Sequence, residues 1–196
     1  KHYGLKSKGN KKALEKELEV FYQGLVNYLP NEDKIKLSLL ADGASPLDIS
    51  KSLAEIKSIK VSTKHQNKLV LGADSVISLK NELINKPSNR EEAFEILKKL
   101  NNSIHHLISS VCISKNGAMV WNHSDSSELK MKNLTETQLK DYLGKIDTKT
   151  LLAYGVYQIE AEGVNLFDYI KGDHNSIMGL PIKSIINYIK QYKNND

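Results

Sequence analysis

The chain has 196 residues, of which 40% are hydrophobic and 26% are charged, enough for one substantial core or two small lobes around a cleft. Its formal net charge of +5 is carried almost wholly by lysine, because Arg90 is the only arginine among 28 basic residues. Arginine is the usual reader of guanine edges and the usual bidentate phosphate ligand. The composition therefore argues against a sequence-specific DNA-binding protein and favours a solvated, lysine-rich surface.

The single cysteine favours an intracellular, reducing compartment. Cys112 has no intrachain partner and lies in a strand-like run, where we expect a small core residue rather than a nucleophile. No stretch approaches the roughly 18 apolar residues of a membrane span, and residues 1–12 are charged, without the apolar core of a signal peptide. We expect a cytoplasmic protein with no membrane partner.

In chain order, helical spacing of apolar residues first predicts a helix over residues 11–25. Residues 31–43 are polar and fit no single pattern. Ser45 and Pro46 then form an N-cap followed by proline at the first helical position. They predict the start of a helix with one apolar face, made by Ile49, Leu53 and Ile56.

The next segment predicts a buried strand, a hairpin and a helix from three local signals. An apolar run is typical of a buried strand, and a polar turn between short apolar runs is typical of a hairpin. A serine followed three residues later by glutamate is a capping box, which begins a helix. The ranges are 69–73 for the strand, 76–79 and 82–84 for the hairpin, and 88–91 for the capping box.

The second half of the chain is richer in strand patterns. Strands are expected at 107–113, 118–121, 126–131, 155–159 and 166–170, the first two joined by an Asn-Gly turn at 116–117. Helices are expected to begin at Thr135 and at Pro181. Helices and hairpins without regular β-α-β repeats favour an α/β fold with a mixed sheet rather than a doubly wound one.

Three polar residues stand out by their context. Asp74 follows the buried-strand pattern, where a carboxylate can ligate a metal ion, act as a base or merely begin a turn. Lys86 precedes Pro87, which fixes the local backbone, although a lone lysine is usually solvated. Lys57 borders the apolar face of a predicted helix, where snorkelling is the commoner role. One carboxylate and two lysines are what a triphosphate site needs.

Six short motifs connect these residues in one pattern. Residues 53–58 (LAEIKS), 71–76 (LGADSV) and 85–87 (NKP) resemble L-A-x-x-K-A, G-A-D-T-V and G-K-P. Residues 106–111 (HLISSV), 154–158 (YGVYQ) and 172–181 (GDHNSIMGLP) resemble H-x-V-x-T-G-V, G-A-Y-x-x-Q (or its variant G-A-Y-Q) and G-x-x-x-x-V-x-G-L-P. In this order they are motifs of the Maf family of nucleotide pyrophosphatases, which the chain resembles from about Glu32 to its end.

The resemblance implies one domain over residues 1–196, with two lobes around a cleft, as in the inosine triphosphate pyrophosphatases. It implies an enzyme that hydrolyses nucleoside triphosphates to the monophosphate and pyrophosphate, with Mg²⁺ or Mn²⁺ as cofactor. Homodimers are common in such a family, and no specific nucleic-acid partner is expected. The substrates are expected to be pyrimidine triphosphates, UTP or dTTP, rather than 7-methyl-GTP.

The family's functional positions fall on particular residues of this chain. The resemblance implies that Asp74 is the catalytic aspartate and that Lys57 and Lys86 contact phosphates. The metal ion would be held by Asp74 and by a glutamate that falls on Glu32, with a Glu32-Asp33 pairing as the alternative. Ser75 and Gln158 fall on base-contacting positions, and an amide can both donate to and accept from a base edge.

The chain departs from the family pattern over residues 1–31. The family begins with a strand and an S-x-S-P-R-R loop that holds phosphates, whereas this chain has GLKSKGNKK at 4–12. Ser7, Lys11 and Lys12 are the available replacements, although lysine lacks the bidentate fork of arginine. The alternative function is a catalytically impaired, Maf-like nucleotide-binding or division-regulatory protein. A non-specific RNA-binding role, which rests on charge alone, ranks below both.

His105 and His106 are adjacent, so on a strand they point to opposite faces and are not expected to share a metal ion. His106 falls on the family's motif histidine. We therefore expect His106 to be structural and His105 to lie on the surface.

Overall fold

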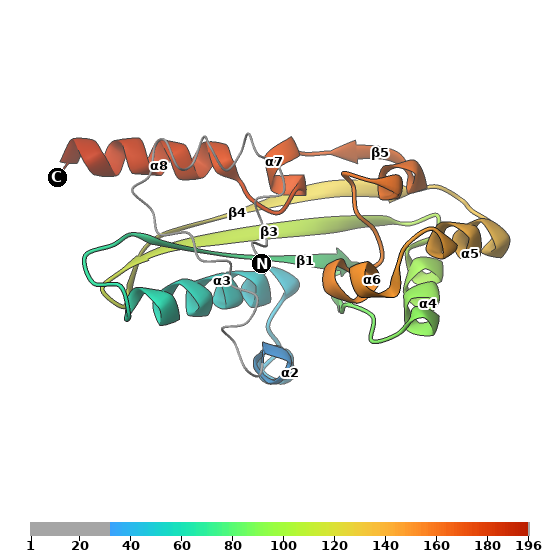
Figure 1. Ribbon diagram of the computed structural model, residues 1–196, viewed down its shortest axis with the longest axis horizontal. Helices are drawn as coiled ribbons and strands as arrows, with labels where there is room; N and C mark the ends of the chain where they lie inside the picture. The colour runs from blue at the N-terminus through green and yellow to red at the C-terminus, as the bar shows by residue number, and fades with distance from the viewer. Residues whose placement is uncertain (1–31, 196) are drawn as a thin grey trace. The chain divides into compact units, whose positions relative to one another are not determined.

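The computed structural model describes residues 32–195 of the chain. The helices are α2 (Glu32–Ala41), α3 (Pro46–Ser62), α4 (Arg90–Leu100), α5 (Glu136–Gly144), α6 (Thr148–Tyr154), α7 (His174–Ile177), α8 (Ile182–Asn195) and the short 3₁₀ helix η1 (Glu162–Leu166). The strands are β1 (Val70–Leu79), β2 (Glu82–Ile84), β3 (Ile104–Lys115), β4 (Ala118–Met131) and β5 (Phe167–Lys171) (Figure 1). The helix expected over 11–25 lies outside the described residues.

The five strands form one antiparallel sheet in the order β2-β1-β3-β4-β5. Lys80 and Asn81 both have positive φ, 51° and 66°, as a two-residue hairpin turn requires, and they join β1 to β2. Asn116 and Gly117 adopt the same left-handed conformation between β3 and β4. Both predicted hairpins and the α/β class are confirmed.

The chain divides into two compact units, in agreement with the expected two lobes. Unit 1 contains the described residues up to Ser75, together with Ile108–Ser126 and those from Asp173 onward. Unit 2 contains Val76–Leu107 and Ser127–Gly172. Each unit has its own apolar core. The long strands β1, β3 and β4 contribute residues to both cores.

The core of unit 1 forms where α8 packs on the sheet. Ile182, Ile185 and Ile189 recur at helical spacing and are almost fully buried against Leu71, Val111 and Ile113. Cys112 is 1% exposed, so its expected place in the core is confirmed. The core of unit 2 gathers apolar residues of α4 and α5 with Leu129 and Met131 of β4.

The helix starts follow the expected capping chemistry, with one shift. Ser45 caps α3 through a capping box with Asp48, and Thr135 caps α5 through one with Gln138. At α4, however, the N-cap is Asn89 rather than Ser88. The capping box expected at 88–91 therefore does not form: Asn89 accepts from the N–H of Glu92, and both donors of Ser88 bind the Glu92 side chain.

Three strand predictions need correction. The strand expected at 69–73 and the hairpin strand expected at 76–79 are one continuous strand, β1. Residues 118–121 and 126–131 are one continuous strand, β4, because the polar residues between them also belong to it. Residues 155–159 are not a strand: α6 ends at Tyr154, and Gly155 follows with a φ of 90°. The strand expected at 166–170 is confirmed as β5, and the ambiguous polar segment 31–43 contains α2.

The predicted places of the two histidines are reversed. His105 is fully buried, and its Nε2 lies 2.9 Å from the hydroxyl oxygen of Tyr157, whereas His106 is exposed. Because β3 begins at Ile104, the pleat directs position 105 into the core of unit 2 and position 106 away from it. The motif histidine is therefore the exposed one, and its neighbour is structural.

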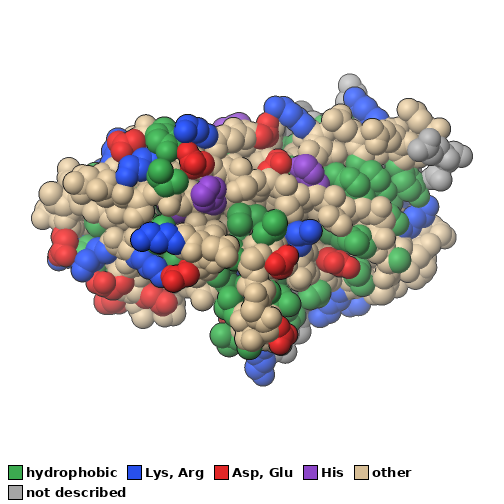
Figure 2. All heavy atoms as spheres, turned by 180° about the vertical axis from the view of Figure 1, so that it is seen from behind, with side chains coloured by type: hydrophobic (Ala, Val, Ile, Leu, Met, Phe, Trp, Pro, Cys, Tyr) green, Lys and Arg blue, Asp and Glu red, His purple; other side chains and the backbone are tan. Residues whose placement is uncertain are grey.

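The lysine surplus is distributed as a solvated surface. Figure 2 shows Lys and Arg side chains interspersed with Asp and Glu side chains over the described residues of one face. Of the helices within residues 32–195, none combines the length and apolarity that crossing a bilayer requires.

Candidate functional site

Asp74 lies in the middle of β1 and is buried, with a side chain only 7% exposed. Its main-chain carbonyl accepts a hydrogen bond from the hydroxyl of Ser50 on α3, at 3.1 Å. Oδ1 of the carboxylate accepts from the Lys57 ammonium at 2.6 Å. Oδ2 is buried and has no hydrogen-bond partner among the described residues. A carboxylate oxygen without a partner in a buried site is free to bind an added ligand.

The approach of α3 to β1 depends on Gly72. A Cβ atom built at Gly72 would lie 2.3 Å from the carbonyl oxygen of Ala54 and 2.7 Å from the main-chain nitrogen of Ser58. Only glycine therefore allows the two backbones to come this close. Since Lys57 lies between these two contacts on α3, the close approach brings its ammonium to the Asp74 carboxylate. Figure 1 shows α3 running alongside β1.

Glu32 completes the cluster from the first turn of α2. Its Oε2 lies 3.2 Å from Nζ of Lys57, and its Oε1 lies 3.0 Å from Nζ of Lys36, four residues further along the helix. Asp33 is exposed, and no ion pair of Asp33 with another described residue is found. The geometry thus favours Glu32 over a Glu32-Asp33 pair. Lys36 was not foreseen, although its i,i+4 spacing from Glu32 is a sequence signal.

The cluster shifts the pKa values of its three central groups. Burial raises the pKa of the Asp74 carboxyl above its ordinary value, and the nearby Lys57 ammonium only partly opposes this. Burial alone would lower the pKa of Lys57, but the carboxylates of Asp74 and Glu32 raise it overall. For Glu32, burial is outweighed by Lys57 and Lys36, which together lower its pKa. The cluster therefore shifts the pKa values of the two carboxyl groups in opposite directions.

The two carboxylates suit a hard divalent cation bound together with a phosphorylated ligand. Asp74 contributes the unpartnered Oδ2, and Glu32, which pairs with the same lysine, is partly exposed. Within residues 32–195, no group of three or more His, Cys, Asp or Glu side chains could hold a metal ion. Mg²⁺ commonly binds through one or two carboxylates and fills its remaining positions with water and phosphate oxygens. The residues present fit that kind of site.

A chain of hydrogen-bonded hydroxyl groups begins at Ser75, next to Asp74, and determines whether the Ser75 hydroxyl donates or accepts. Ser109 donates its only proton to the main-chain carbonyl of Ser176 at 2.7 Å. In the 2.9 Å contact between Ser75 and Ser109, Ser75 must therefore be the donor. Ser75 is exposed and lies beside Gly179, so its hydroxyl presents lone pairs to a ligand. Sequence reasoning missed Ser109, although it lies in the 106–111 motif.

Lys86 and Gln158, the other two predicted site residues in the described range, belong to unit 2. Lys86 is exposed on the segment after β2 and donates to the carbonyl oxygen of Ala153 at 3.0 Å. Gln158 is half-buried in the loop after α6, whose backbone packs tightly against Gly163. Ser7 and Lys11, the expected replacements for the phosphate loop, lie outside the described residues.

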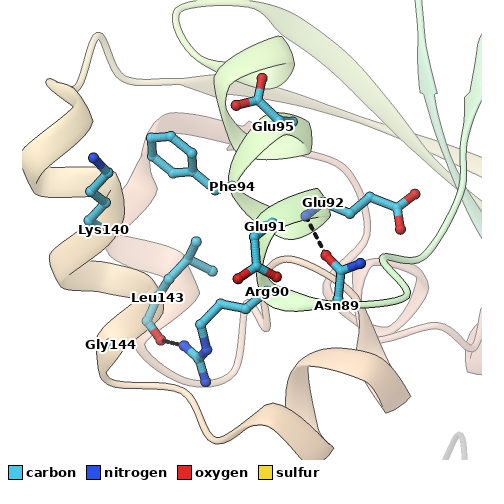
Figure 3. A pocket seen from close by; sticks show the side chains of 9 residues that line it. All are labelled: Asn89, Arg90, Glu91, Glu92, Phe94, Glu95, Lys140, Leu143 and Gly144. Carbon is cyan, nitrogen blue, oxygen red and sulfur yellow. Dashed lines mark hydrogen bonds between the residues drawn. The ribbon is translucent and has the colours of Figure 1, made fainter.

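Unit 2 also has a groove between α4 and α5 with a volume of about 720 Å³. Arg90 lies in it, and Figure 3 shows its guanidinium directed at the carbonyl oxygen of Leu143. The same group also donates to the carbonyl of Ile146 and the hydroxyl of Thr148. Arg90 therefore satisfies carbonyl groups at the end of α5, and the acidic groove residues Glu91, Glu92 and Glu95 make this a poor phosphate site.

Comparison with known proteins places the cluster in a family context. The family model described as "Maf-like protein" matches residues 11–192. A nucleoside triphosphate pyrophosphatase of Pelagibacter ubique is 55% identical over 163 residues, which cover 83% of this chain and 84% of that protein. One of Ruegeria pomeroyi with the same name is 37% identical over 159 residues, covering 81% and 80%. A 7-methyl-GTP pyrophosphatase of Brucella abortus is 32% identical over 163 residues, covering 83% and 82%.

Proposed function

This chain belongs to the family of Maf-like proteins, and from that membership we propose that it hydrolyses nucleoside triphosphates to the monophosphate and pyrophosphate. Relatives that are 55% and 37% identical carry the name nucleoside triphosphate pyrophosphatase. The observation that carries the proposal is the buried pair of Asp74 and Lys57, with Glu32 beside it. A base, a fixed positive charge and a second carboxylate are the groups that this hydrolysis requires.

Asp74 is the proposed base of the reaction. It would orient and deprotonate the water that attacks the α-phosphorus, so that the α–β phosphoanhydride bond breaks and pyrophosphate leaves. The raised pKa of the Asp74 carboxyl supports this role, because a more basic carboxylate removes a proton from water more readily. Ser50 holds the main-chain carbonyl of Asp74 and Lys57 pairs with its carboxylate before the nucleotide binds, so the residue is already in position for attack.

The lysines are proposed to stabilise the leaving group. An ammonium is a compact point charge, suited to the negative charge that builds up on pyrophosphate oxygens in the transition state. Lys57 is held by carboxylates within the cluster, and Lys86 is exposed on unit 2. Both are proposed to contact the substrate phosphates.

Asp74 and Glu32 are proposed to hold the divalent cofactor, Mg²⁺ or Mn²⁺. When bound, the ion would offset the charge of the triphosphate and polarise the phosphoryl group. The buried, unpartnered Oδ2 of Asp74 supports this assignment.

For the base, we propose a preference for UTP or dTTP. Ser75 presents an acceptor, because its proton is used by Ser109, and the N3–H group of uracil or thymine is a matching donor. Cytosine has an acceptor at N3 instead of a donor, so its lone pair would face a lone pair of the Ser75 hydroxyl and no hydrogen bond would form. Gln158 is proposed to contact the base edge as well. The Brucella abortus relative shows that the family also contains 7-methyl-GTP pyrophosphatases, so the preference needs a direct test.

A pyrophosphate-release assay on a panel of nucleotides with Mg²⁺ or Mn²⁺ tests the proposal, with the products separated by chromatography. We expect monophosphate and pyrophosphate in equal amounts and no turnover after the divalent ion is chelated. Diphosphate with inorganic phosphate would exclude this reaction class. Nucleotide binding without turnover on the whole panel would instead favour the catalytically impaired, nucleotide-binding alternative.

A further inference from the structure

We propose that Lys57 is a displaceable internal cation: its ammonium fills the place between Glu32 and Asp74 that a divalent ion needs, and the nucleotide must draw it away. The protein would then bind the metal ion weakly alone and tightly together with the nucleotide. This inference rests on the proposed function for the identity of the nucleotide. It does not depend on turnover.

The geometry of the cluster places Lys57 between the two carboxylates. Its Nζ lies 2.6 Å from Oδ1 of Asp74 and 3.2 Å from Oε2 of Glu32, and the Lys57 side chain is only 11% exposed. A cation that bridged the same two carboxylates would have to share this small, nearly closed space with the ammonium. Since the two cannot share it without strong repulsion, one must leave when the other binds.

The charges of the cluster also disfavour a free metal ion. Glu32 and Asp74 carry two negative charges, while Lys57 and Lys36 carry two positive charges, so the four side chains are formally neutral. A neutral, partly buried cluster gains little from binding an additional divalent cation, whose dehydration is costly. Without Lys57 the same cluster would carry one net negative charge and would have two carboxylates open to the ion.

A nucleoside triphosphate competes with the two carboxylates for the Lys57 ammonium. Its phosphate oxygens offer the ammonium new partners, and the four-carbon stem of lysine allows the head group to swing while its base stays on α3. The carboxylates released in this way become available to the ion that accompanies the nucleotide. The two ligands therefore raise each other's affinity, as thermodynamic linkage requires.

Direct binding of Mn²⁺ to the nucleotide-free protein tests the inference, with free Mn²⁺ followed by its electron paramagnetic resonance signal. Lys57→Met keeps the length of the side chain and removes its charge, and we expect it to bind Mn²⁺ about tenfold or more tightly than the wild type. Lys36→Met removes an ammonium that pairs with Glu32 and acts on Asp74 only as the smallest of its charge effects, so it controls for a general charge effect. It should raise the affinity by much less.

Adding Asp74→Asn to Lys57→Met should abolish the gain in Mn²⁺ affinity, because it removes a proposed ligand. That loss would locate the bound ion at the cluster. Equal Mn²⁺ affinity of Lys57→Met and the wild type, or equal gains for Lys57→Met and Lys36→Met, would overturn the proposal. These results are separable from failure of the proposed function, because a protein without pyrophosphatase activity can still show the Mn²⁺ difference.

If Lys57→Met does not fold, as judged by circular dichroism, calorimetry on the wild type decides. The ligand is then an α,β-methylene analogue of UTP, which has no cleavable α–β anhydride. We expect the analogue to bind measurably without metal, because the nucleotide displaces Lys57 first. No binding of the analogue until Mn²⁺ is added would contradict that order.

Discussion

Nζ of Lys57 lies 2.6 Å from Oδ1 of Asp74, and this ion pair connects α3 to β1 across 17 residues of sequence. Neither side chain needs a ligand to reach this position, because each is anchored on a regular element and the pair is mostly buried. The charged groups proposed for catalysis are thus gathered before substrate binds, and the substrate phosphates have only to redirect the Lys57 ammonium.

Asp74→Asn should keep the fold and most of the nucleotide affinity but reduce turnover by roughly 10²-fold or more, the scale of a lost general base. Asparagine keeps the shape of the side chain while removing its charge and basicity. Steady-state kinetics and analogue binding measure the two effects separately. Turnover near the wild-type rate would show that Asp74 is not the base.

Glu32→Gln should raise the concentration of divalent ion required for half-maximal activity by about tenfold, because it removes one of two proposed carboxylate ligands. Asp33→Asn is the matched control, since Asp33 is the next residue on α2 but is exposed. It should leave the metal requirement unchanged. If Asp33→Asn raised the metal requirement more than Glu32→Gln did, Asp33 and not Glu32 would be the metal ligand.

Ser75→Ala should reduce the preference for UTP over CTP by about tenfold in kcat/KM, the value of one lost hydrogen bond. Gln158→Ala should also flatten discrimination among bases. Kinetics on UTP, dTTP, CTP and 7-methyl-GTP give the ratios. A wild-type preference for 7-methyl-GTP over UTP and dTTP would refute the pyrimidine proposal itself.

Stability should fall in acid because of His105. Burial lowers the pKa of His105 to about 4, below the ordinary value of 6.5, so the folded protein takes up the proton less readily than the unfolded chain. The contribution of neutral His105 to the free energy of unfolding is fully present above pH 6.5 and is lost as the pH falls from there towards 4. The total loss is about 3 kcal/mol. Urea unfolding followed by circular dichroism at pH 7.5 and 5.0 measures it.

His105→Gln is the control for that measurement, because glutamine can still bond Tyr157 but does not titrate. This variant should lose stability at both pH values and show a smaller difference between them. If the wild type and the variant lost the same free energy on acidification, the carboxylates and not His105 would be responsible.

Gly72→Ala should destabilise the protein by about 1–3 kcal/mol, the usual effect of overpacking, because the new methyl group meets backbone atoms of α3. The shift of α3 should also move Lys57 away from Asp74 and lower activity. Gly144→Ala is the matched control, since a Cβ atom there has no neighbour within 4 Å. Its unfolding midpoint in urea should be unchanged or slightly higher.

Sequence reasoning worked where the signal is local or carried by a motif. The caps at Ser45 and Thr135 and the turn at Asn116-Gly117 depend on neighbouring residues alone, and all three are found. The motifs around Lys57 and Asp74 selected two residues that the structure brings into contact, while their roles in catalysis stay predictions.

The misassignments arose where tertiary packing decides. The prediction placed His106 in the core and His105 on the surface, and the structure has the opposite, because neighbouring residues on a strand point to opposite faces. Residues 155–159 have the composition of a strand but follow a helix through a left-handed glycine and have no strand partner. The role of Arg90 at the end of α5 was equally invisible, because its carbonyl partners are more than 50 residues away.

The close contact at Gly72 has a consequence for large-scale mutagenesis. In a screen that scores only activity, nearly every substitution at Gly72 should be as harmful as one at Asp74, although Gly72 has no side chain with which to touch a substrate. A parallel screen for the amount of folded protein should separate the two positions. Asp74→Asn should accumulate normally, whereas Gly72 variants should be depleted from cells along with their activity.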